Sequence, residues 1–178
     1  AAARIRLEPR QAADIKQVAA IDRLSFPTPW PENAFDHELL RNERSHFLVA
    51  RIITGNAPWY ARWRAGARRI IGYVGYWLVL DEAHISTIAV RPEYRRRGIG
   101  AALLMAILRD AVRRGAAEAT LEVREGNREA QSLYQKYGFE LVGHRKGYYR
   151  DSGEDALLMT ANPILLEPDP QALSKVSS

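Results

Sequence analysis

The sequence contains no cysteine. This absence excludes disulfide bonds, thiolate metal ligands and a covalent acyl-cysteine intermediate. The four histidines follow no spacing typical of a metal site, so we expect no metal. No apolar run approaches the roughly 20 residues of a membrane-spanning helix, and residues 1–6 lack the order of a signal peptide. We therefore expect no membrane contact and a cytoplasmic protein.

The charge of the chain is the first feature that points to a ligand. The chain has 26 lysines and arginines against 21 acidic residues, a formal net charge of +5. Such a balance suits nucleic acid, a membrane surface or a polyphosphate ligand. A basic nucleic-acid-binding protein stays an alternative, although the chain has no recognised nucleic-acid motif. The position of the arginines must decide among these ligands. The sequence leaves the oligomeric state open.

The hydrophobic pattern predicts an α/β fold with a mixed sheet. Apolar runs bounded by turn residues predict strands at 4–7, 47–53, 70–80, 84–90, 120–123, 139–144 and 156–161. Helical spacing predicts helices at 9–26, 31–40, 98–114 and 127–138. We expect one domain over residues 1–161 and a loosely held tail with proline and serine over 162–178.

The most informative stretch is an arginine-rich loop with two glycines, placed between a predicted strand and the strongest predicted helix. It reads Arg-Pro-Glu-Tyr-Arg-Arg-Arg-Gly-Ile-Gly over residues 91–100. A helix start offers unpaired N–H groups and the positive end of a dipole. Gly98 and Gly100 let a ligand approach the backbone, and Arg95, Arg96 and Arg97 add forked donors. The pattern indicates a pyrophosphate site, whereas the alternative is a basic turn. Neither the Walker nor the dinucleotide spacing is present.

A second unusual feature is a carboxylate inside an apolar strand. Glu122 lies between Leu121 and Val123, so its side chain faces away from both neighbours. It is either a general base or a surface glutamate paired with an arginine. Tyr134 is either a core aromatic or a positioned acid, and the pattern favours the core. Asn127 is more typical of a helix N-cap than of a ligand contact.

Together these residues resemble the GCN5-related N-acetyltransferase (GNAT) superfamily. Its phosphate motif is Arg or Gln, two residues, Gly, one residue, then Gly or Ala, and Arg95, Gly98 and Gly100 match it. The resemblance runs over about residues 5–159. Within the superfamily, residues 87–90, 121–124, 133–134, 145–149 and 153–156 are similar to the RimI type, which acetylates the N-terminal alanine of a small-subunit ribosomal protein.

The resemblance implies an acyl-CoA N-acyltransferase fold, with a mixed central sheet of about seven strands flanked by helices. It implies acetyl-CoA as co-substrate, Glu122 as general base and Tyr134 as general acid. The implied coenzyme contacts are Ile88, Ala89, Val90, Arg95, Arg96, Arg97, Gly98, Ile99, Gly100, Ala101 and Asn127. With these roles, we expect desolvation to raise the pKa of Glu122 and make it a better base.

The expected acceptor is a protein N-terminus, because the 145–159 segment is similar to that of the RimI type. Trp30, Tyr148 and Tyr149 are expected to flank the peptide groove, the two tyrosines from a loop between the last strands. The alternative for these two tyrosines is packing at the edge of the sheet. Alternatives are a lysine side chain, a polyamine or another small amine, or a degenerate coenzyme-binding module. Compact relatives make a short turn where this chain has residues 54–69, with Trp59, Tyr60 and Trp63. This insertion is either a longer hairpin or an added contact with a partner.

Overall fold

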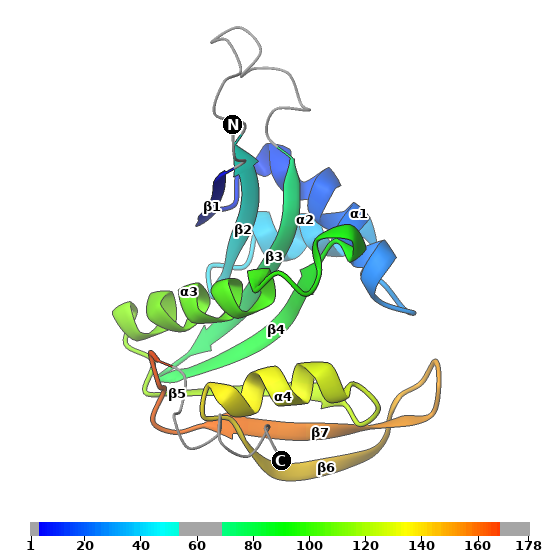
Figure 1. Cartoon of the computed structure of the whole chain (residues 1–178), viewed down its shortest axis with the longest axis vertical. Coiled ribbons are helices and arrows are strands. Elements are labelled where there is room, and N and C mark those ends of the chain that lie inside the picture. Colours follow the sequence, from blue (N-terminus) through cyan, green and yellow to red (C-terminus); the bar gives the residue numbers. More distant parts are fainter. Residues whose placement is uncertain (1–3, 54–68, 168–178) are drawn as a thin grey trace, which may run out of the picture. The chain divides into compact units, whose positions relative to one another are not determined.

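The computed structural model describes residues 4–53 and 69–167 (Figure 1). The three aromatic residues of the predicted insertion, Trp59, Tyr60 and Trp63, lie outside the described residues, as does the end of the expected tail. The proposals for that insertion therefore stay predictions. Among the described residues, no helix is long and apolar enough to cross a membrane.

Seven strands form one mixed sheet, which confirms the predicted fold class. Their order in the sheet is β1-β2-β3-β4-β5-β7-β6. Strands β4 and β5 are parallel, while β1 with β2, β5 with β7 and β6 with β7 are antiparallel. The strands are β1 (Arg4–Pro9), β2 (Ser45–Ile53), β3 (Ile70–Val79), β4 (Glu82–Val90), β5 (Glu118–Arg124), β6 (Glu140–Tyr149) and β7 (Glu154–Ala161).

Four α-helices accompany the sheet over the described ranges, together with two short 3-10 helices. They are α1 (Ile15–Ser25), α2 (Glu32–Leu40), α3 (Ile99–Arg113) and α4 (Arg128–Lys136), and the 3-10 helices are Ala12–Asp14 and Pro92–Tyr94. The first helix begins later than its spacing predicted, because Arg4–Pro9 extends as a strand whose last residue pairs with Leu48. Helix α3 closely follows its predicted range.

The chain divides into two compact units. Unit 1 contains residues 1–75 and 87–106, and unit 2 contains residues 76–86 and 107–178. In unit 1, α1 and α2 contribute Ile21 and Phe35 to a core with Phe47, Val49 and Tyr73 from the strands.

Unit 2 is built around β5, which pairs with β7 from Ala119↔Ala161 to Arg124↔Ala156. Its core contains Leu121 and Phe139, both almost fully buried. Strand β6 pairs with β7 on one side and is largely exposed (Figure 1). The described part of the expected tail also contacts this unit, since Ile164 N–H donates to the Ala117 carbonyl and the Asn162 amide to Glu118.

Candidate active site

The loop that joins β4 to α3 in unit 1 turns sharply before the helix begins. Two of its residues have left-handed backbone conformations, Arg96 with φ of 62° and Gly98 with φ of 76°. A Cβ on Gly98 would meet no atom within 4 Å, so the space over the loop is open. The loop leads into α3, whose first N–H groups have no acceptor within the helix. This arrangement suits an anion such as a pyrophosphate.

The arginines of this loop are held in place by unit 1 itself. Arg95 Nε donates to the Val90 carbonyl at 3.0 Å, and Arg95 also reaches the Ser25 hydroxyl at 3.3 Å. The Arg97 guanidinium lies 5.4 Å from the centre of the Tyr94 ring. Arg95 thus ties the loop to the end of β4, in addition to the positive charge that it brings.

Strand β4 has an edge suited to an extended ligand. Its parallel pairing with β5 covers Glu82–Ile85 against Glu118–Leu121, although β4 continues to Val90. Ile88, Ala89 and Val90 follow the last of these pairs. Ala89 is buried, whereas Ile88 and Val90 are half-buried. The backbone groups on this edge of β4 are therefore suited to bind a strand-like ligand.

Glu122 is enclosed by the strands of unit 2. Leu121 and Val123 are buried on the opposite face, as predicted, and the Glu122 side chain is 13% exposed. His84 Nε2 lies 3.1 Å from one carboxylate oxygen, and Arg145 lies 3.8 Å from the other. The hydrogen bond with His84 lowers the pKa of Glu122 against the opposing effect of burial. The prediction that the pKa of Glu122 is raised was wrong, because it considered desolvation and not the hydrogen bond with His84.

Sequence reasoning missed His84 as part of this site. His84 follows Ala83 and precedes Ile85 in β4, both of which are buried, so it is a polar residue in an apolar strand, like Glu122. Its ring stacks on Trp77 with centroids 5.5 Å apart and an interplanar angle of 20°. A polar residue within an apolar strand could have drawn attention to His84. The parallel register that places it beside Glu122 cannot be inferred from the sequence.

Tyr134 lies on α4 and is buried. Its ring packs on Phe139 at 5.8 Å, and burial raises the pKa of its hydroxyl, with a smaller contribution from Tyr149. No described residue forms a hydrogen bond with this hydroxyl. Asn127 caps the same helix, since its side chain accepts a hydrogen bond from Ala130 N–H at 3.2 Å. Tyr134 is therefore a core aromatic whose hydroxyl has no hydrogen-bond partner among the described residues.

Tyr148 and Tyr149 end strand β6, whereas we expected them in a loop. The strand continues because Tyr149 pairs with Glu154 across the turn to β7. Arg124 stacks 3.9 Å from the Tyr149 ring centre and is ion-paired with Asp151 at 2.8 Å. Burial raises the pKa of Tyr149 to about 12. Tyr149 is thus fixed on the sheet, while Tyr148 is exposed.

Trp30 is held in unit 1 by a buried carboxylate. One oxygen of Asp22 accepts a hydrogen bond from the backbone N–H of Trp30 at 2.6 Å. The other accepts from the Tyr73 hydroxyl at 2.5 Å. The Tyr73 hydroxyl is also 3.1 Å from Thr87 Oγ1. Burial raises the pKa of the Asp22 carboxyl despite these hydrogen bonds. This network fixes the segment between α1 and α2.

We expect Asp22→Ala to destabilise the fold by about 1–3 kcal/mol, because it leaves buried donors without an acceptor. The matched control is Asp22→Asn. Its carbonyl keeps one acceptor, and the Tyr73 hydroxyl still has Thr87 as a partner. Urea unfolding compares the two variants, and equal losses would contradict this account of the network.

Wild type and Asp22→Asn together test the titration of Asp22. Its folded-state pKa is raised above the unfolded value of about 3.9. The folded state therefore binds the proton more tightly, and this contribution to stability is present below about pH 4 and is lost as the pH rises through the folded pKa. The stability of wild type relative to Asp22→Asn should fall as the pH is raised from about 4 toward neutrality.

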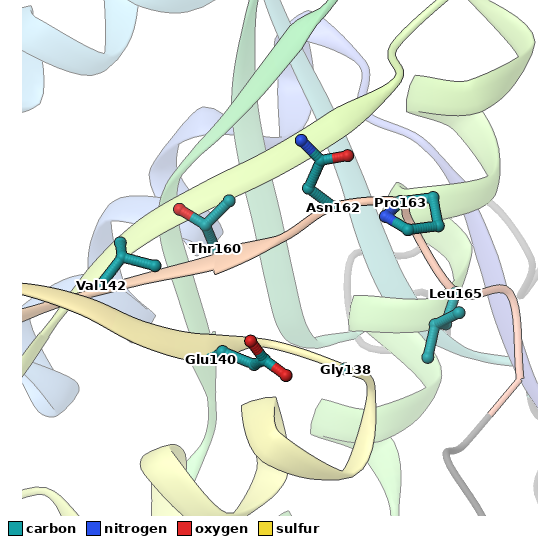
Figure 2. Close-up of a pocket in the computed structure, with 7 residues that line it drawn as sticks. All are labelled: Gly138, Glu140, Val142, Thr160, Asn162, Pro163 and Leu165. Carbon is teal, nitrogen blue, oxygen red and sulfur yellow. The ribbon is translucent and has the colours of Figure 1, made fainter.

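Two other features of unit 2 do not mark the catalytic site. A pocket of about 270 Å³ lies between the start of β6 and the end of β7, and Figure 2 shows its lining of Glu140, Val142, Thr160 and neighbouring residues. It contains none of the predicted site residues. Glu125, His144 and Asp155 place ligand atoms within 4.8 Å of one another, but Asp155 already binds His144 Nε2 and Gly147 N–H.

The predicted site residues fall into two groups. Trp30 and the residues of the 88–101 stretch belong to unit 1. Glu122, Asn127, Tyr134 and the two tyrosines of β6 belong to unit 2. Within unit 2, Tyr149 interacts electrostatically with both Glu122 and Tyr134. The second group, with His84 beside Glu122, therefore gathers a carboxylate, a histidine and phenolic hydroxyls in unit 2, which is chemistry suited to proton transfer.

Comparison with known proteins agrees with this chemistry. The sequence profile of the acetyltransferase (GNAT) family matches residues 15–139. The chain is 44% identical over 156 residues to the [ribosomal protein bS18]-alanine N-acetyltransferase of Escherichia coli, covering 86% of this chain and 94% of that protein. It is 35% identical over 153 residues to the N-alpha-acetyltransferase RimI of Mycobacterium tuberculosis, covering 83% and 85%.

A solved structure extends the likeness to the fold. The crystal structure of the ribosomal-protein-S18-alanine N-acetyltransferase from Escherichia coli superposes with a TM-score of 0.75 and 29% identity, covering 94% of this chain and 98% of that one. The protein therefore combines a seven-stranded mixed sheet with a family match over most of its length. The protein belongs to the acetyltransferase (GNAT) family and is an acetyl-CoA-dependent N-acetyltransferase.

Proposed function

We propose that the acceptor is the α-amino group of a protein N-terminus, the N-terminal alanine of the small-subunit ribosomal protein bS18. The observation that carries this proposal is the 44% identity, over 86% of the chain, to an enzyme named for that acceptor. Of the residues that resembled the RimI type, 145–149 lie on β6 and 154–156 on β7 in unit 2, and Arg145 lies 3.8 Å from Glu122.

Acetyl-CoA is assigned to the β4 edge and the loop that follows it. Ile88, Ala89 and Val90 offer backbone groups to the pantetheine arm. The loop and the first turn of α3 bind the pyrophosphate through N–H groups and positive charge, with the residues Arg95, Arg96, Arg97, Gly98, Ile99, Gly100 and Ala101. The open left-handed backbone at Gly98 supports this assignment. Asn127 uses its side-chain oxygen as the cap of α4, which leaves its NH₂ group for the coenzyme.

Glu122 is the proposed general base. An α-amino group has a pKa of about 7.7–8.0, so much of it is protonated at neutral pH and cannot attack. Glu122 takes one proton from this ammonium group, directly or through a water, and the amine nitrogen then bonds to the thioester carbonyl carbon. The nitrogen of the tetrahedral intermediate gives its second proton to solvent, and the C–S bond breaks as the intermediate collapses, which leaves an amide and a thiolate.

Tyr134 is the proposed general acid. The thiolate of coenzyme A is a stronger base than a carboxylate, and a phenol can protonate it at hydrogen-bond distance. The buried Tyr134 hydroxyl, with its raised pKa, stays protonated until a strong base arrives. The hydroxyl has no other partner among the described residues, which supports this role. Trp30, Tyr148 and Tyr149 are proposed to flank the peptide.

We expect turnover to be confined to a free N-terminal alanine. The assay measures thiol release from acetyl-CoA with three acceptors: a bS18 N-terminal peptide, a lysine peptide blocked at its N-terminus, and spermidine. The control is the same bS18 peptide with an acetylated N-terminus, which removes only the nucleophile. Turnover on the blocked lysine peptide or spermidine, at a rate equal to that on the free peptide, would overturn the proposed acceptor and leave the family assignment intact.

A further inference from the structure

Strand β6 contains a bulge between Arg145 and Tyr149. Arg145 pairs with Ala156 of β7. Tyr149 pairs with Glu154, so four steps along β6 face two steps along β7. Gly147 lies in the middle of this bulge with φ of 59°, a left-handed backbone that residues with a side chain rarely adopt. Because a bulge re-aims the side chains beside it, it decides where the residue after the glycine is placed.

Asp155 of β7 holds the bulge through a side-chain hydrogen bond. Its Oδ1 accepts from the Gly147 N–H at 2.8 Å, and its Oδ2 lies 2.7 Å from Nε2 of His144. The hydrogen bond from Gly147, and then the contact with His144, lower the pKa of the Asp155 carboxyl. The acceptor is thus a carboxylate at neutral pH and the bond is charge-assisted. The Asp155 carbonyl also accepts from the Glu125 N–H at 3.1 Å, which fixes Asp155 to the end of β5.

Tyr148 directly follows the glycine and lies between two anchored neighbours. On one side, Gly147 is bound by Asp155. On the other side, Tyr149 continues the strand and stacks with Arg124, whose guanidinium lies 3.9 Å from the ring centre. Tyr148 itself is 46% exposed. Its position therefore depends on the backbone on either side of it rather than on packing in the core.

The exposed Tyr148 ring lies beside the cation that faces the proposed base. The Arg145 guanidinium lies 5.6 Å from the centre of the Tyr148 ring and 3.8 Å from Glu122. The rings of Tyr148 and Tyr149 meet edge to face, with centroids 5.2 Å apart and an interplanar angle of 89°. A tyrosine ring offers a large contact area to a peptide and loses little conformational freedom. A change in the bulge would therefore move a peptide contact relative to the carboxylate.

We propose that Asp155 is a positioning residue for the acceptor peptide, because its hydrogen bond with Gly147 sets the bulge that places the Tyr148 ring. The proposal rests on the proposed function, in which Tyr148 flanks the peptide. Asp155 takes part in no bond-making step and acts on the peptide through the backbone of β6. The residues assigned to acetyl-CoA lie in unit 1, apart from Asn127, so Asp155 should affect binding of the peptide and not of the coenzyme.

Asp155→Ala and Asp155→Asn separate this role from a general loss of stability. The alanine variant removes the acceptor, whereas the asparagine variant keeps a carbonyl oxygen for the Gly147 N–H. We expect Asp155→Ala to raise KM for the alanine peptide about 3-fold to 10-fold, the factor that corresponds to one lost hydrogen bond. The kcat at saturating peptide and KM for acetyl-CoA should not change. Asp155→Asn should stay close to wild type, and so should the control His144→Gln, which removes the other side-chain partner of Asp155.

Gly147→Val and Gly147→Asn disturb the same bulge from its other side. Valine is strained at a positive φ, whereas asparagine adopts that conformation more readily. Gly147→Val should therefore raise KM for the peptide as Asp155→Ala does, and Gly147→Asn should not. This pair tests the bulge if Asp155→Ala does not fold. Acetyl-CoA binding and the melting temperature confirm the folding of each variant.

Tyr148→Ala distinguishes failure of this inference from failure of the proposed peptide groove. It should raise KM for the peptide at least as much as Asp155→Ala, and the double variant should bind the peptide no more weakly than Tyr148→Ala alone. If Tyr148→Ala raises KM and Asp155→Ala does not, the positioning role is overturned and the groove stands. If Tyr148→Ala leaves KM unchanged, both are overturned. A rise in KM for Asp155→Asn or His144→Gln equal to that for Asp155→Ala would overturn the role of the Gly147 hydrogen bond.

Discussion

Glu122→Gln should lower kcat for the alanine peptide by about 10²–10⁴-fold, the usual contribution of a positioned acid or base. The amide has nearly the shape of the carboxylate and keeps one oxygen near Arg145, but it cannot take a proton. KM for acetyl-CoA should not change, because the coenzyme is assigned to the β4 edge and the loop before α3. The measurement is steady-state thiol release at saturating peptide and acetyl-CoA.

Glu118→Gln is the matched control for this experiment. Glu118 lies on the same strand, four residues before Glu122, and its carboxylate accepts a hydrogen bond from the Asn162 amide. The two variants lose the same charge from the same strand, so only the position differs. We expect Glu118→Gln to keep its activity. A Glu122→Gln enzyme that retained more than a tenth of wild-type kcat would show that the proton leaves by another route.

Arg51→Met should destabilise the protein by about 3–5 kcal/mol, the largest stability effect that the structure predicts. Arg51 of β2 lies 2.9 Å from both oxygens of Asp14 and 2.6 Å from Glu8 of β1. Arg51 and Asp14 are buried, with side chains 7% and 5% exposed. Loss of the guanidinium leaves the Asp14 charge in the interior of unit 1 without the cation that is hydrogen-bonded to both of its oxygens. Denaturant unfolding, followed by fluorescence, measures the loss.

Two comparisons make this prediction specific. Arg69→Met breaks an ion pair with Glu93 whose side chains are about half exposed, so it should cost less than about 1 kcal/mol. Adding Asp14→Asn to Arg51→Met removes the uncompensated charge and should restore part of the lost stability. If Arg51→Met costs no more than Arg69→Met, the buried pair does not stabilise the fold.

The elements that depend on local signals were predicted from the sequence. Apolar spacing predicted α3 at 98–114, and the helix spans Ile99–Arg113. Asn127 was expected as an N-cap and is one. The glycines and arginines before α3 predicted a loop open to an anion, and the left-handed backbone at Arg96 and Gly98 agrees. These features are set by neighbours in the chain, so a single sequence contains them.

Features that depend on strand register were not predicted. His84 and Glu122 are 38 positions apart in the sequence, and only the parallel pairing of β4 with β5 brings them together. The direction of the Glu122 pKa shift was wrong for the same reason, because the hydrogen bond from β4 outweighs burial. Tyr148 and Tyr149 were placed in a loop because the pairing of Tyr149 with Glu154 is not visible in the sequence.

The place of β5 in the sheet has a consequence for synthesis on the ribosome. The strand that carries Glu122 lies between β4 and β7, and β7 is the last of the seven strands in chain order. Chains generally fold from the N-terminal side as they emerge, but β5 has no second neighbour until residues 154–161 have left the exit tunnel. A nascent chain stalled before Glu154 should thus be able to pair β1 with β2 while it lacks acetyltransferase activity. The enzyme becomes competent only after residues 154–161 have been synthesised.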